Sequence, residues 1–276
     1  MNMQLLDKDL TKFEWQEIEN LLKRQNKNIT DDLEQMWYLI DLVWDDLGCN
    51  NKKLDWRKIK AFYSHPVWLL NGLFIEQHEI SMAHRHAISN WIFENKFRKV
   101  IDYGGGFGTL ARLIAKKDIR IDVYIYEPYP SKFAIKKIKE YPNITFINEL
   151  SSDYDCLICI DVLEHVPYPL EVFKQMIESV KIDGYLVISN CFYPVIKCHL
   201  PCTFHLRYTF NTFAKMMGLE VIGLLEGSPA TIFKKITDKQ IDMLKVKRFE
   251  KLSRIFFPII ETLKPILRPI KRLISK

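Results

Sequence analysis

The segment that most constrains this chain is residues 100–110, which read Val-Ile-Asp-Tyr-Gly-Gly-Gly-Phe-Gly-Thr-Leu. An apolar stretch leads into an acid, glycines crowd the next positions, and a helical pattern then runs to residue 117. A strand, a glycine turn and a helix in this order hold a nucleotide-like ligand at the carboxyl end of a parallel sheet. Glycine is needed because the turn takes positive φ and the ligand must approach the backbone closely. We therefore predict a ligand site at this turn.

The glycine spacing separates two ligand classes. A dinucleotide fingerprint places a third glycine three residues after the second, and counting from Gly104 and Gly106 that position is Thr109. The chain instead offers acid-x-Gly-x-Gly-x-Gly, from Asp102 to Gly108. This pattern resembles the first motif of the class I S-adenosylmethionine (SAM)-dependent methyltransferases, whose glycine turn holds the cofactor. A glycine-rich turn without a ligand is the alternative interpretation.

The chain from residue 99 onward alternates apolar runs with helical patterns, which predicts a parallel sheet covered by helices. Strands are expected at 100–103, 123–126, 144–147, 156–161, 185–190, 220–225 and 230–234, and helices at 110–117, 132–140, 169–180 and 210–217. Gly227-Ser228-Pro229 separates the last two strands, which are expected to pair antiparallel. The predicted fold class is α/β: a Rossmann-like, seven-stranded, mostly parallel sheet with an antiparallel terminal hairpin. Over about residues 80–237 this layout is similar to that of the class I methyltransferases.

The chain before the glycine turn is predicted to form a helical cap. Apolar residues recur there at helical spacing, Thr30-Asp31-Asp32 offers a helix start, and Gly48 offers a stop. All six tryptophans fall in this region, where we expect them to build a helical core or to line a substrate pocket. The predicted division of the chain is a helical N-terminal cap (1–97), a Rossmann-like SAM-binding domain (98–237) and a basic amphipathic C-terminal tail (238–276).

Composition argues against several other classes of protein. No apolar run reaches 18 residues, and residues 1–9 lack the basic start and apolar segment of a secretory leader. Cys191, Cys198 and Cys202 form no CxxC pair, and Cys156 and Cys159 lie inside an apolar run, so a zinc site is not expected. We expect a cytoplasmic protein with reduced thiols.

The basic charge is concentrated in the tail. The net charge is +6, but residues 245–276 hold ten Lys or Arg and two Glu, so the rest of the chain carries −2. Nucleic-acid binding by the main domain is therefore not indicated. Apolar residues recur at helical spacing in the tail, and Pro258, Pro265 and Pro269 are expected to divide it into short segments. The apolar side is expected to pack on the domain or on another subunit, or to attach to an anionic membrane surface.

Further cofactor contacts follow from the strand ends. Glu127 ends the second predicted strand 25 residues after Asp102, near the distance at which related folds place an acid over a ribose. In the resembled family this acid holds the SAM ribose, because a carboxylate accepts charge-assisted hydrogen bonds from two vicinal hydroxyls. A polar residue after the third strand often contacts the adenine in the family, and Asn148 occupies that place. The predicted cofactor residues are Asp102, Tyr103, Gly104, Gly105, Gly106, Gly108, Glu127, Pro128, Asn148, Asp161 and Val162.

The run from Asp161 to Pro167 resembles the fourth-strand motif of small-molecule methyltransferases, including those of quinone synthesis. Methyl transfer from SAM is an in-line displacement, which chiefly requires alignment. An alcohol acceptor must also lose a proton, and a histidine suits that role. His165 is therefore the first candidate base, with His199 and His205 as further candidates. The alternative is a histidine that only closes the loop.

A divalent cation is another possibility at this motif. In some quinone and RNA 2′-O-methyltransferases a Glu-x-x-Glu-His run binds a cation, and Asp161-x-x-Glu164-His165 is close to that run. A cation would lower the pKa of the acceptor hydroxyl directly. Because the first acid is shorter and no further ligand is evident, we predict a site without metal and keep Asp161, Glu164 and His165 as the alternative.

The segment 191–207 is expected to cross the carboxyl ends of the strands and to line the acceptor pocket. Tyr193 and Arg207 are the predicted acceptor contacts there, because Arg207 can bind a phosphate or carboxylate bidentately. Arg85 is a third, because it lies in a polar cluster on the helix that packs beside the SAM site in the resembled enzymes. For each of these residues, an ordinary solvated side chain is the alternative.

Taken together, these features predict a class I SAM-dependent methyltransferase that O-methylates a small sugar- or phosphate-bearing metabolite, with surface-glycan synthesis as a suitable setting. A quinone- or lipid-directed methyltransferase at the membrane surface is one alternative, suggested by the tail and by the motif at Asp161. A non-catalytic SAM-binding partner is the other.

Overall fold

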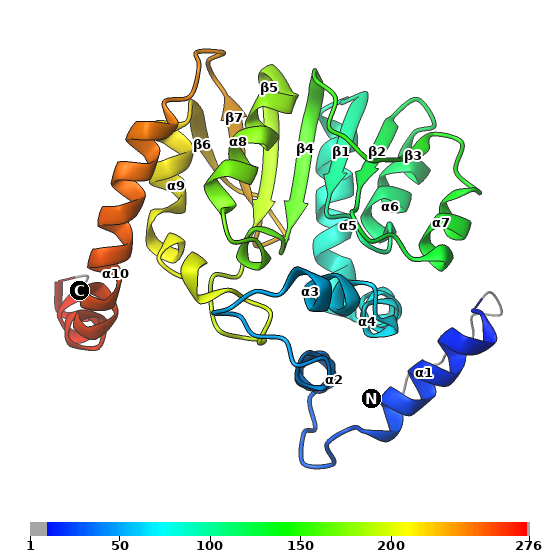
Figure 1. The fold of residues 1–276 in the computed structure, drawn as a ribbon. Helices are drawn as coiled ribbons and strands as arrows, with labels where there is room; N and C mark the ends of the chain where they lie inside the picture. The colour runs from blue at the N-terminus through cyan, green and yellow to red at the C-terminus, as the bar shows by residue number, and fades with distance from the viewer. Residues whose placement is uncertain (1–9, 275–276) are drawn as a thin grey trace.

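Seven strands form one sheet in the computed structural model, which describes the backbone of residues 10–274 and the side chains of residues 10–263 (Figure 1). The strands are β1 (Lys99–Tyr103), β2 (Asp122–Tyr126), β3 (Ile144–Ile147), β4 (Tyr154–Ile160), β5 (Val180–Ser189), β6 (Leu219–Leu224) and β7 (Thr231–Lys235). Their order is β3-β2-β1-β4-β5-β7-β6; the first five pair in parallel, and β7 runs antiparallel to both of its neighbours. The predicted fold class is confirmed. Residues 1–9, on which the absence of a leader was predicted, lie outside the described residues.

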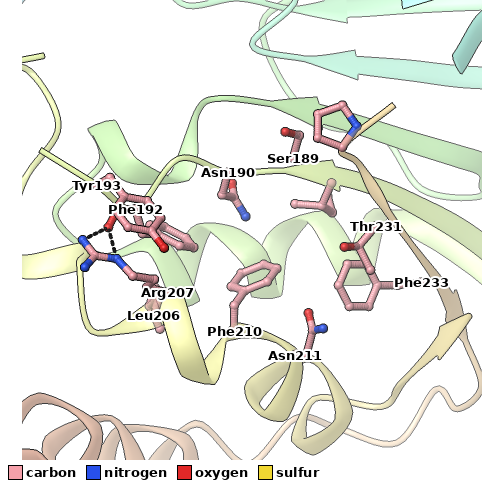
Figure 2. Close-up of a pocket in the computed structure, with 12 residues that line it drawn as sticks. Ser189, Asn190, Phe192, Tyr193, Leu206, Arg207, Phe210, Asn211, Thr231 and Phe233 are labelled. Atoms are coloured by element: carbon pink, nitrogen blue, oxygen red, sulfur yellow. Dashed lines mark hydrogen bonds between the residues drawn. The ribbon is translucent and has the colours of Figure 1, made fainter. Parts of the chain in front are cut away.

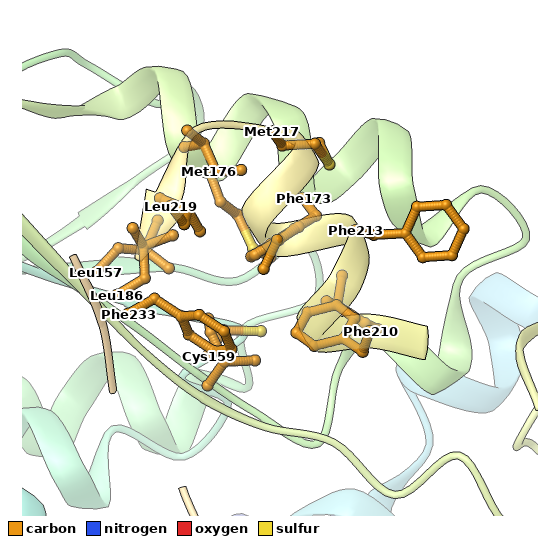
Figure 3. Packing of buried hydrophobic residues seen from close by; sticks show 14 of the residues in the cluster. Leu157, Cys159, Phe173, Met176, Leu186, Phe210, Phe213, Met217, Leu219 and Phe233 are labelled. Carbon is orange, nitrogen blue, oxygen red and sulfur yellow. The ribbon is translucent and has the colours of Figure 1, made fainter. Parts of the chain in front are cut away.

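Alternation along the strands builds a separate core on each face of the sheet. Ile101 and Leu157 point to the face covered by α8 (Pro169–Ser179) and α9 (Leu206–Met216), where Phe173 and Phe210 join them (Figure 3). The neighbouring Val100 points to the opposite face, which is covered by α5 (Glu79–Glu94) and α6 (Thr109–Lys117). Because both of its faces are covered, the central strand β4 is apolar on both sides from Cys156 to Ile160.

From residue 10 onward, four helices precede α5 and form the cap: α1 (Lys12–Lys23), α2 (Asp32–Asp46), α3 (Trp56–Tyr63) and α4 (Pro66–Gln77). The predicted helix start holds, because the Asp31 side chain accepts a hydrogen bond from the Glu34 N–H and caps α2. Trp44 is buried in the cap core against Phe62. The tryptophans do not all share this core: Trp56 is exposed, and Trp91 packs against the main sheet.

The cap packs directly on the glycine turn. Gly72 of α4 faces the Phe107 ring, and a Cβ placed at Gly72 would lie 2.6 Å from two ring atoms. Glu76, at the end of α4, accepts a hydrogen bond from the Thr109 hydroxyl at 2.9 Å and forms an ion pair with Arg112. Phe107 also stacks on Phe133, with ring centroids 5.1 Å apart. The turn is therefore held from above by α4 as well as from below by the sheet.

Two elements begin earlier than the sequence predicts. The strand β5 starts at Val180 and not at the predicted residue 185, because Val180 pairs with Tyr154 before a register irregularity. The helix α9 starts at Leu206, four residues ahead of the predicted 210. Consequently Arg207 lies in the first turn of a helix and not in a loop.

The tail forms one continuous helix, α10 (Met243–Ile274), so the prediction of short segments is wrong. A proline removes a single backbone hydrogen bond and bends a helix without necessarily ending it. One side of α10 packs on α9 through Val246 and through contacts of Ser253 with His205 and Thr209. None of the helices in the described part of the chain is long and apolar enough to span a membrane.

The contact between the cap and the glycine turn predicts that Gly72→Ala destabilises the protein. Alanine in a helix is usually better than glycine by about 1 kcal/mol, but the added Cβ would overpack the Phe107 ring. Overpacking typically costs about 1–3 kcal/mol, so we expect a net loss of stability in urea unfolding. Asn71→Ala, one position earlier in α4, is the matched control and should be neutral or stabilising. A Gly72→Ala protein as stable as that control would contradict the packing.

Candidate functional site

The glycine turn connects β1 to α6 and lies beside the end of β2. Gly104, Gly106 and Gly108 all have positive φ, of 74°, 47° and 74°. The Gly104 N–H donates to the Tyr126 carbonyl at 2.7 Å, which extends the β1–β2 ladder into the turn. A Cβ at Gly104 would lie 2.4 Å from a methyl carbon of Val162, so the predicted cofactor residue Val162 closes one side of the turn.

Glu127 and Gly106 face each other across the predicted cofactor site. The Gly106 N–H donates to Glu127 Oε2 at 3.1 Å, and the Tyr129 N–H donates to Oε1 at 2.9 Å. Each carboxylate oxygen keeps acceptor capacity for a further donor. A Cβ built at Gly106 would meet nothing closer than 3.9 Å, so the turn leaves open space beside the carboxylate. A ribose with two vicinal hydroxyls fits this arrangement.

Asp102 supports the turn from beneath. Its buried carboxylate accepts a hydrogen bond from the Ala111 N–H in the first turn of α6, and a Cβ at Gly105 would lie 2.7 Å from Asp102 Oδ2. Burial raises the pKa of Asp102 to about 7, although the nearby Arg85 opposes this shift. The carboxyl therefore stabilises the start of α6, where the exposed amides of a helix favour an acceptor.

Arg85 lies among the predicted cofactor residues. It projects from α5, donates to the Ser81 carbonyl at 3.0 Å and interacts with the charges of Asp102 and Asp161. Asp161 follows β4 with a φ of 53°, a conformation that is uncommon outside glycine and that concentrates at functional sites. Part of the Asp161 residue is exposed to solvent, but its carboxyl group is surrounded largely by protein. This desolvation raises the pKa of Asp161. A guanidinium beside a carboxylate suits an amino-acid group such as the methionine end of SAM.

The remaining predicted cofactor residues differ in how they are placed. Tyr103 is buried and stacks on Tyr126, with ring centroids 4.7 Å apart. Pro128 and Asn148 are exposed and directly follow Glu127 and β3. Tyr103 therefore packs beneath the site, whereas Pro128 and Asn148 lie along its edge.

Two histidines and a buried acid form a compact cluster after β4. Ligand-capable atoms of Glu164, His165 and His199 all lie within 4.8 Å of one another. The Nδ1 of His165 donates to the Cys198 carbonyl at 3.2 Å, and the Nδ1 of His199 donates to the Tyr193 carbonyl at 2.6 Å. A carbonyl only accepts hydrogen bonds, so both neutral rings keep the Nε2 lone pair free. The sequence did not indicate that His199 would join His165.

The acid of this cluster has one satisfied and one unsatisfied oxygen. Glu164 is fully buried; its Oε1 accepts from the Cys191 N–H at 2.6 Å, and its Oε2 has no partner among the described residues. Burial, together with the charge of Asp161, raises the pKa of the Glu164 carboxyl. Burial, reinforced by His199, lowers the pKa of His165 to about 3, so that this ring is neutral. An orphaned buried oxygen of this kind calls for a proton or a cation.

Aromatic side chains of the cap cover this cluster. The rings of Tyr63 and Trp68, from α3 and α4, stack at 5.4 Å, and the edges of both meet His165 at 6.2 and 6.5 Å. Tyr129, which follows Glu127, stacks on the other side of Tyr63 at 6.0 Å. The Trp68 indole N–H is buried without a partner among the described residues. These rings make a flat apolar wall between the Glu127 loop and the histidines.

A pocket lies beyond the carboxyl end of β5, apart from the histidine cluster (Figure 2). Its volume is about 210 Å³, and Asn190, Tyr193 and Arg207 line it with neighbouring apolar residues. The Arg207 guanidinium stacks over the Tyr193 ring at 3.6 Å, donates twice to the Phe192 carbonyl and pairs with Glu261 at 2.9 Å. The two predicted acceptor contacts are therefore adjacent, but Arg207 already has protein partners.

The structure does not bring His205 to the other histidines' cluster. His205 is buried between α9 and α10, where Nδ1 contacts the Ser253 hydroxyl at 3.0 Å and Nε2 lies 3.6 Å from Glu250. Its partners belong to the helix packing. No sequence pattern distinguishes His205 from His199, because both lie in the same segment, residues 191–207.

Comparisons with known proteins find similarity to methyltransferases. Residues 76–210 match a family model described as a methyltransferase domain. This part of the chain is therefore similar to a methyltransferase domain, and its fold and glycine turn are similar to those of the class I SAM-dependent methyltransferases, which use SAM as their cofactor. The match spans α5, the glycine turn, Glu127 and the cluster around His165.

Among individual proteins, similarity is modest. The chain is 28% identical over 150 residues to the ubiquinone biosynthesis O-methyltransferase of Vibrio parahaemolyticus serotype O3:K6, an alignment that covers 50% of this chain and 64% of that protein. It is 29% identical over 138 residues to the enzyme of the same description from Aliivibrio fischeri, covering 45% and 56%. An O-methyltransferase family protein from Burkholderia thailandensis has a solved structure with a TM-score of 0.44, 17% identity and coverage of 67% and 61%.

The cofactor cradle predicts that Glu127→Ala and Gly106→Val weaken binding of S-adenosylhomocysteine. The alanine removes two charge-assisted hydrogen bonds, each worth about 1.5–3 kcal/mol, so we expect at least tenfold weaker binding by titration calorimetry. The valine fills the open space and strains a position at positive φ, and should abolish measurable binding. Glu140→Ala, an exposed acid after α7 (Lys132–Ile138), is the control. Parental affinity in both folded variants would contradict the site.

Buried Asp102 predicts a pH-dependent stability. Its folded pKa of about 7 exceeds the ordinary value of 3.8, so between these values the native state holds a proton that the unfolded chain has released. Asp102 therefore contributes a loss of stability as pH rises through this window. Asp102→Asn keeps the acceptor for Ala111 and cannot ionise, so urea unfolding should show a smaller decline from pH 4.5 to 7 than in the parent. A profile parallel to the parent's, as expected for exposed Asp122→Asn, would contradict this assignment.

Proposed function

We propose that this protein is a SAM-dependent O-methyltransferase whose acceptor carries a hydroxyl on a flat ring. The observation that carries the proposal is the juxtaposition of the Gly106–Glu127 cradle with the cluster of Glu164, His165 and His199 under an aromatic wall. The relatives named above are O-methyltransferases of ubiquinone biosynthesis. The chain covers less than two thirds of their length, so its activity and acceptor are proposals.

The chain's own residues position both reactants. SAM, when bound, supplies an electrophilic methyl group on a sulfonium. Glu127 and the Gly106 loop would hold the ribose, and Arg85 would pair with the carboxylate of the methionine part. Asp161 is close enough to both Arg85 and Glu164 for its charge to act on each of them. The aromatic wall that contains Tyr63 and Trp68 would exclude water from the acceptor and help to align its oxygen with the methyl group, which is the main requirement of an in-line displacement.

Glu164, His165 and His199 would hold a divalent cation that lowers the pKa of the acceptor hydroxyl. Ligand atoms about 2.1 Å from one ion lie roughly 3–4 Å apart, and the ligand atoms of the three side chains, which lie within 4.8 Å of one another, would have to move closer by only a small distance. Their second contacts also suit the role: each histidine is oriented by a backbone carbonyl, as metal-bound histidines commonly are. Of the ligands considered from the sequence, Asp161 lies outside this group and His199 takes its place.

Two hypotheses from the sequence compete with this proposal. His165 acting alone as a general base has the same position but a pKa far below neutrality. A sugar- or phosphate-bearing acceptor depends on Arg207, whose guanidinium is engaged by Phe192 and Glu261. A panel of phenols, catechols and sugar phosphates, assayed by formation of S-adenosylhomocysteine, tests both the activity and the acceptor class. Turnover of sugar phosphates alone would overturn the flat-ring proposal.

The cation proposal predicts that EDTA removes activity and that Mg²⁺ or Mn²⁺ restores it. His199→Ala and Glu164→Gln should lower kcat by about 10² or more while leaving the affinity for S-adenosylhomocysteine within about twofold. The same variants should lose Mn²⁺ binding, measured by electron paramagnetic resonance without any acceptor present. His86→Ala, an exposed histidine on α5, is the control. Activity that resists EDTA yet is lost in His165→Ala would replace the cation with a histidine base.

A further inference from the structure

The outward side of α10 exposes a row of large apolar side chains. Phe249, Leu252, Ile255, Phe256, Ile259, Ile260 and Leu263 are each between 40% and 63% exposed. We call these seven residues the outer face of α10. At about 100° per residue they fall on one half of the helix. A contiguous apolar surface of this kind marks a site of interaction on a soluble protein.

No described part of the fold packs against the outer face of α10. The side of α10 that packs on the domain contains buried Val246, together with Ser253 and Phe257, which meet His205 and Tyr208 of the α9 region. Between α9 and the outer face runs an apolar groove of about 340 Å³, lined by Phe249, Leu252, Phe256 and Ile260 and by Thr212, Phe213 and Met216 of α9. Figure 1 shows α10 along the side of the molecule, with α9 between it and the sheet. The apolar surface therefore continues from the helix into the groove.

The charges beside this face are of one sign. Lys245, Arg248 and Lys251 are exposed on the same helix and take part in no ion pair among the described side chains. The two acids of α10 point to the domain or along the helix: Glu250 pairs with Arg254 and lies near His205, and Glu261 pairs with Arg207. The apolar outer face is therefore flanked by basic side chains that are unpaired within the described part of the chain, and neither acid of α10 is directed toward it.

We propose that the outer face of α10 docks on an anionic lipid bilayer. Phenylalanine, leucine and isoleucine would enter the interfacial region while the flanking Lys245, Arg248 and Lys251 meet lipid phosphates. A second copy of this chain fits less well, because two outer faces in contact would bring like charges together with no acid to pair them. The inference is independent of the reaction catalysed, since no residue of the outer face belongs to the SAM site.

The experiment is co-sedimentation of the full chain with neutral phosphatidylcholine vesicles and with vesicles that contain phosphatidylglycerol. The parent should bind the anionic vesicles at low salt and lose binding as salt rises. Each basic residue near such a surface contributes about fivefold in affinity, so Lys245→Glu/Arg248→Glu/Lys251→Glu should bind at least tenfold more weakly. Lys53→Glu/Lys117→Glu/Lys139→Glu has the same change in charge on other surfaces and should bind nearly as the parent does.

A second pair of variants separates the apolar contribution from charge. Phe256→Glu/Ile259→Glu should abolish binding, whereas Ile119→Glu/Leu224→Glu, at comparably exposed apolar positions elsewhere, should reduce it much less. Circular dichroism and affinity for S-adenosylhomocysteine establish that each variant is folded. Equal binding by the α10 variants and their controls, or no binding by the parent, overturns the proposal. So does a dimer in sedimentation velocity that only the α10 variants disrupt while vesicle binding persists.

Discussion

The hydrogen bond from the Gly104 amide to the Tyr126 carbonyl is the contact on which the site depends. It continues the parallel pairing of β1 with β2 one step past the strands, so the two loops leave the sheet in a fixed register. Because of that register, the Glu127 carboxylate lies beside the open side of Gly106 and accepts a hydrogen bond from the Gly106 N–H. A parallel sheet brings the carboxyl ends of its strands to one edge, and here the same edge also receives Asp161 and Glu164 from β4.

Glu164 connects the sheet edge to the segment that follows β5. Its side chain accepts the Cys191 amide, and its own carbonyl accepts the Leu200 amide at 2.8 Å. Both ends of the loop between these residues are therefore tied to one position. This folds the chain back so that His199 comes beside His165, with ring centroids 4.8 Å apart. The desolvation of Glu164 is the energetic cost of that arrangement, and an ion or proton on Oε2 would offset it.

The sequence was sufficient where local pattern decides the structure. The seven strands, the glycine turn and the place of Glu127 follow from apolar runs and glycine spacing, which depend on neighbouring residues. The pairing of His165 with His199 could not be predicted, because it depends on long-range contacts of Glu164. The early start of β5 has a similar origin, since Val180 joins the sheet through its partner Tyr154 across an irregular register. The sequence does not predict the continuity of α10, because proline usually ends or bends a helix. Contacts with the α9 region stabilise α10 around Pro258.

The near-contact of Gly72 with Phe107 links two parts of the chain that are otherwise separate in sequence. The large ring at position 107 leaves too little room for an unstrained side chain at position 72. A cap placed on this domain would therefore need a residue at position 72 that leaves room for the Phe107 ring. Chimeric proteins that exchange the cap alone should fail for this steric reason, even when both halves fold well in their own parents.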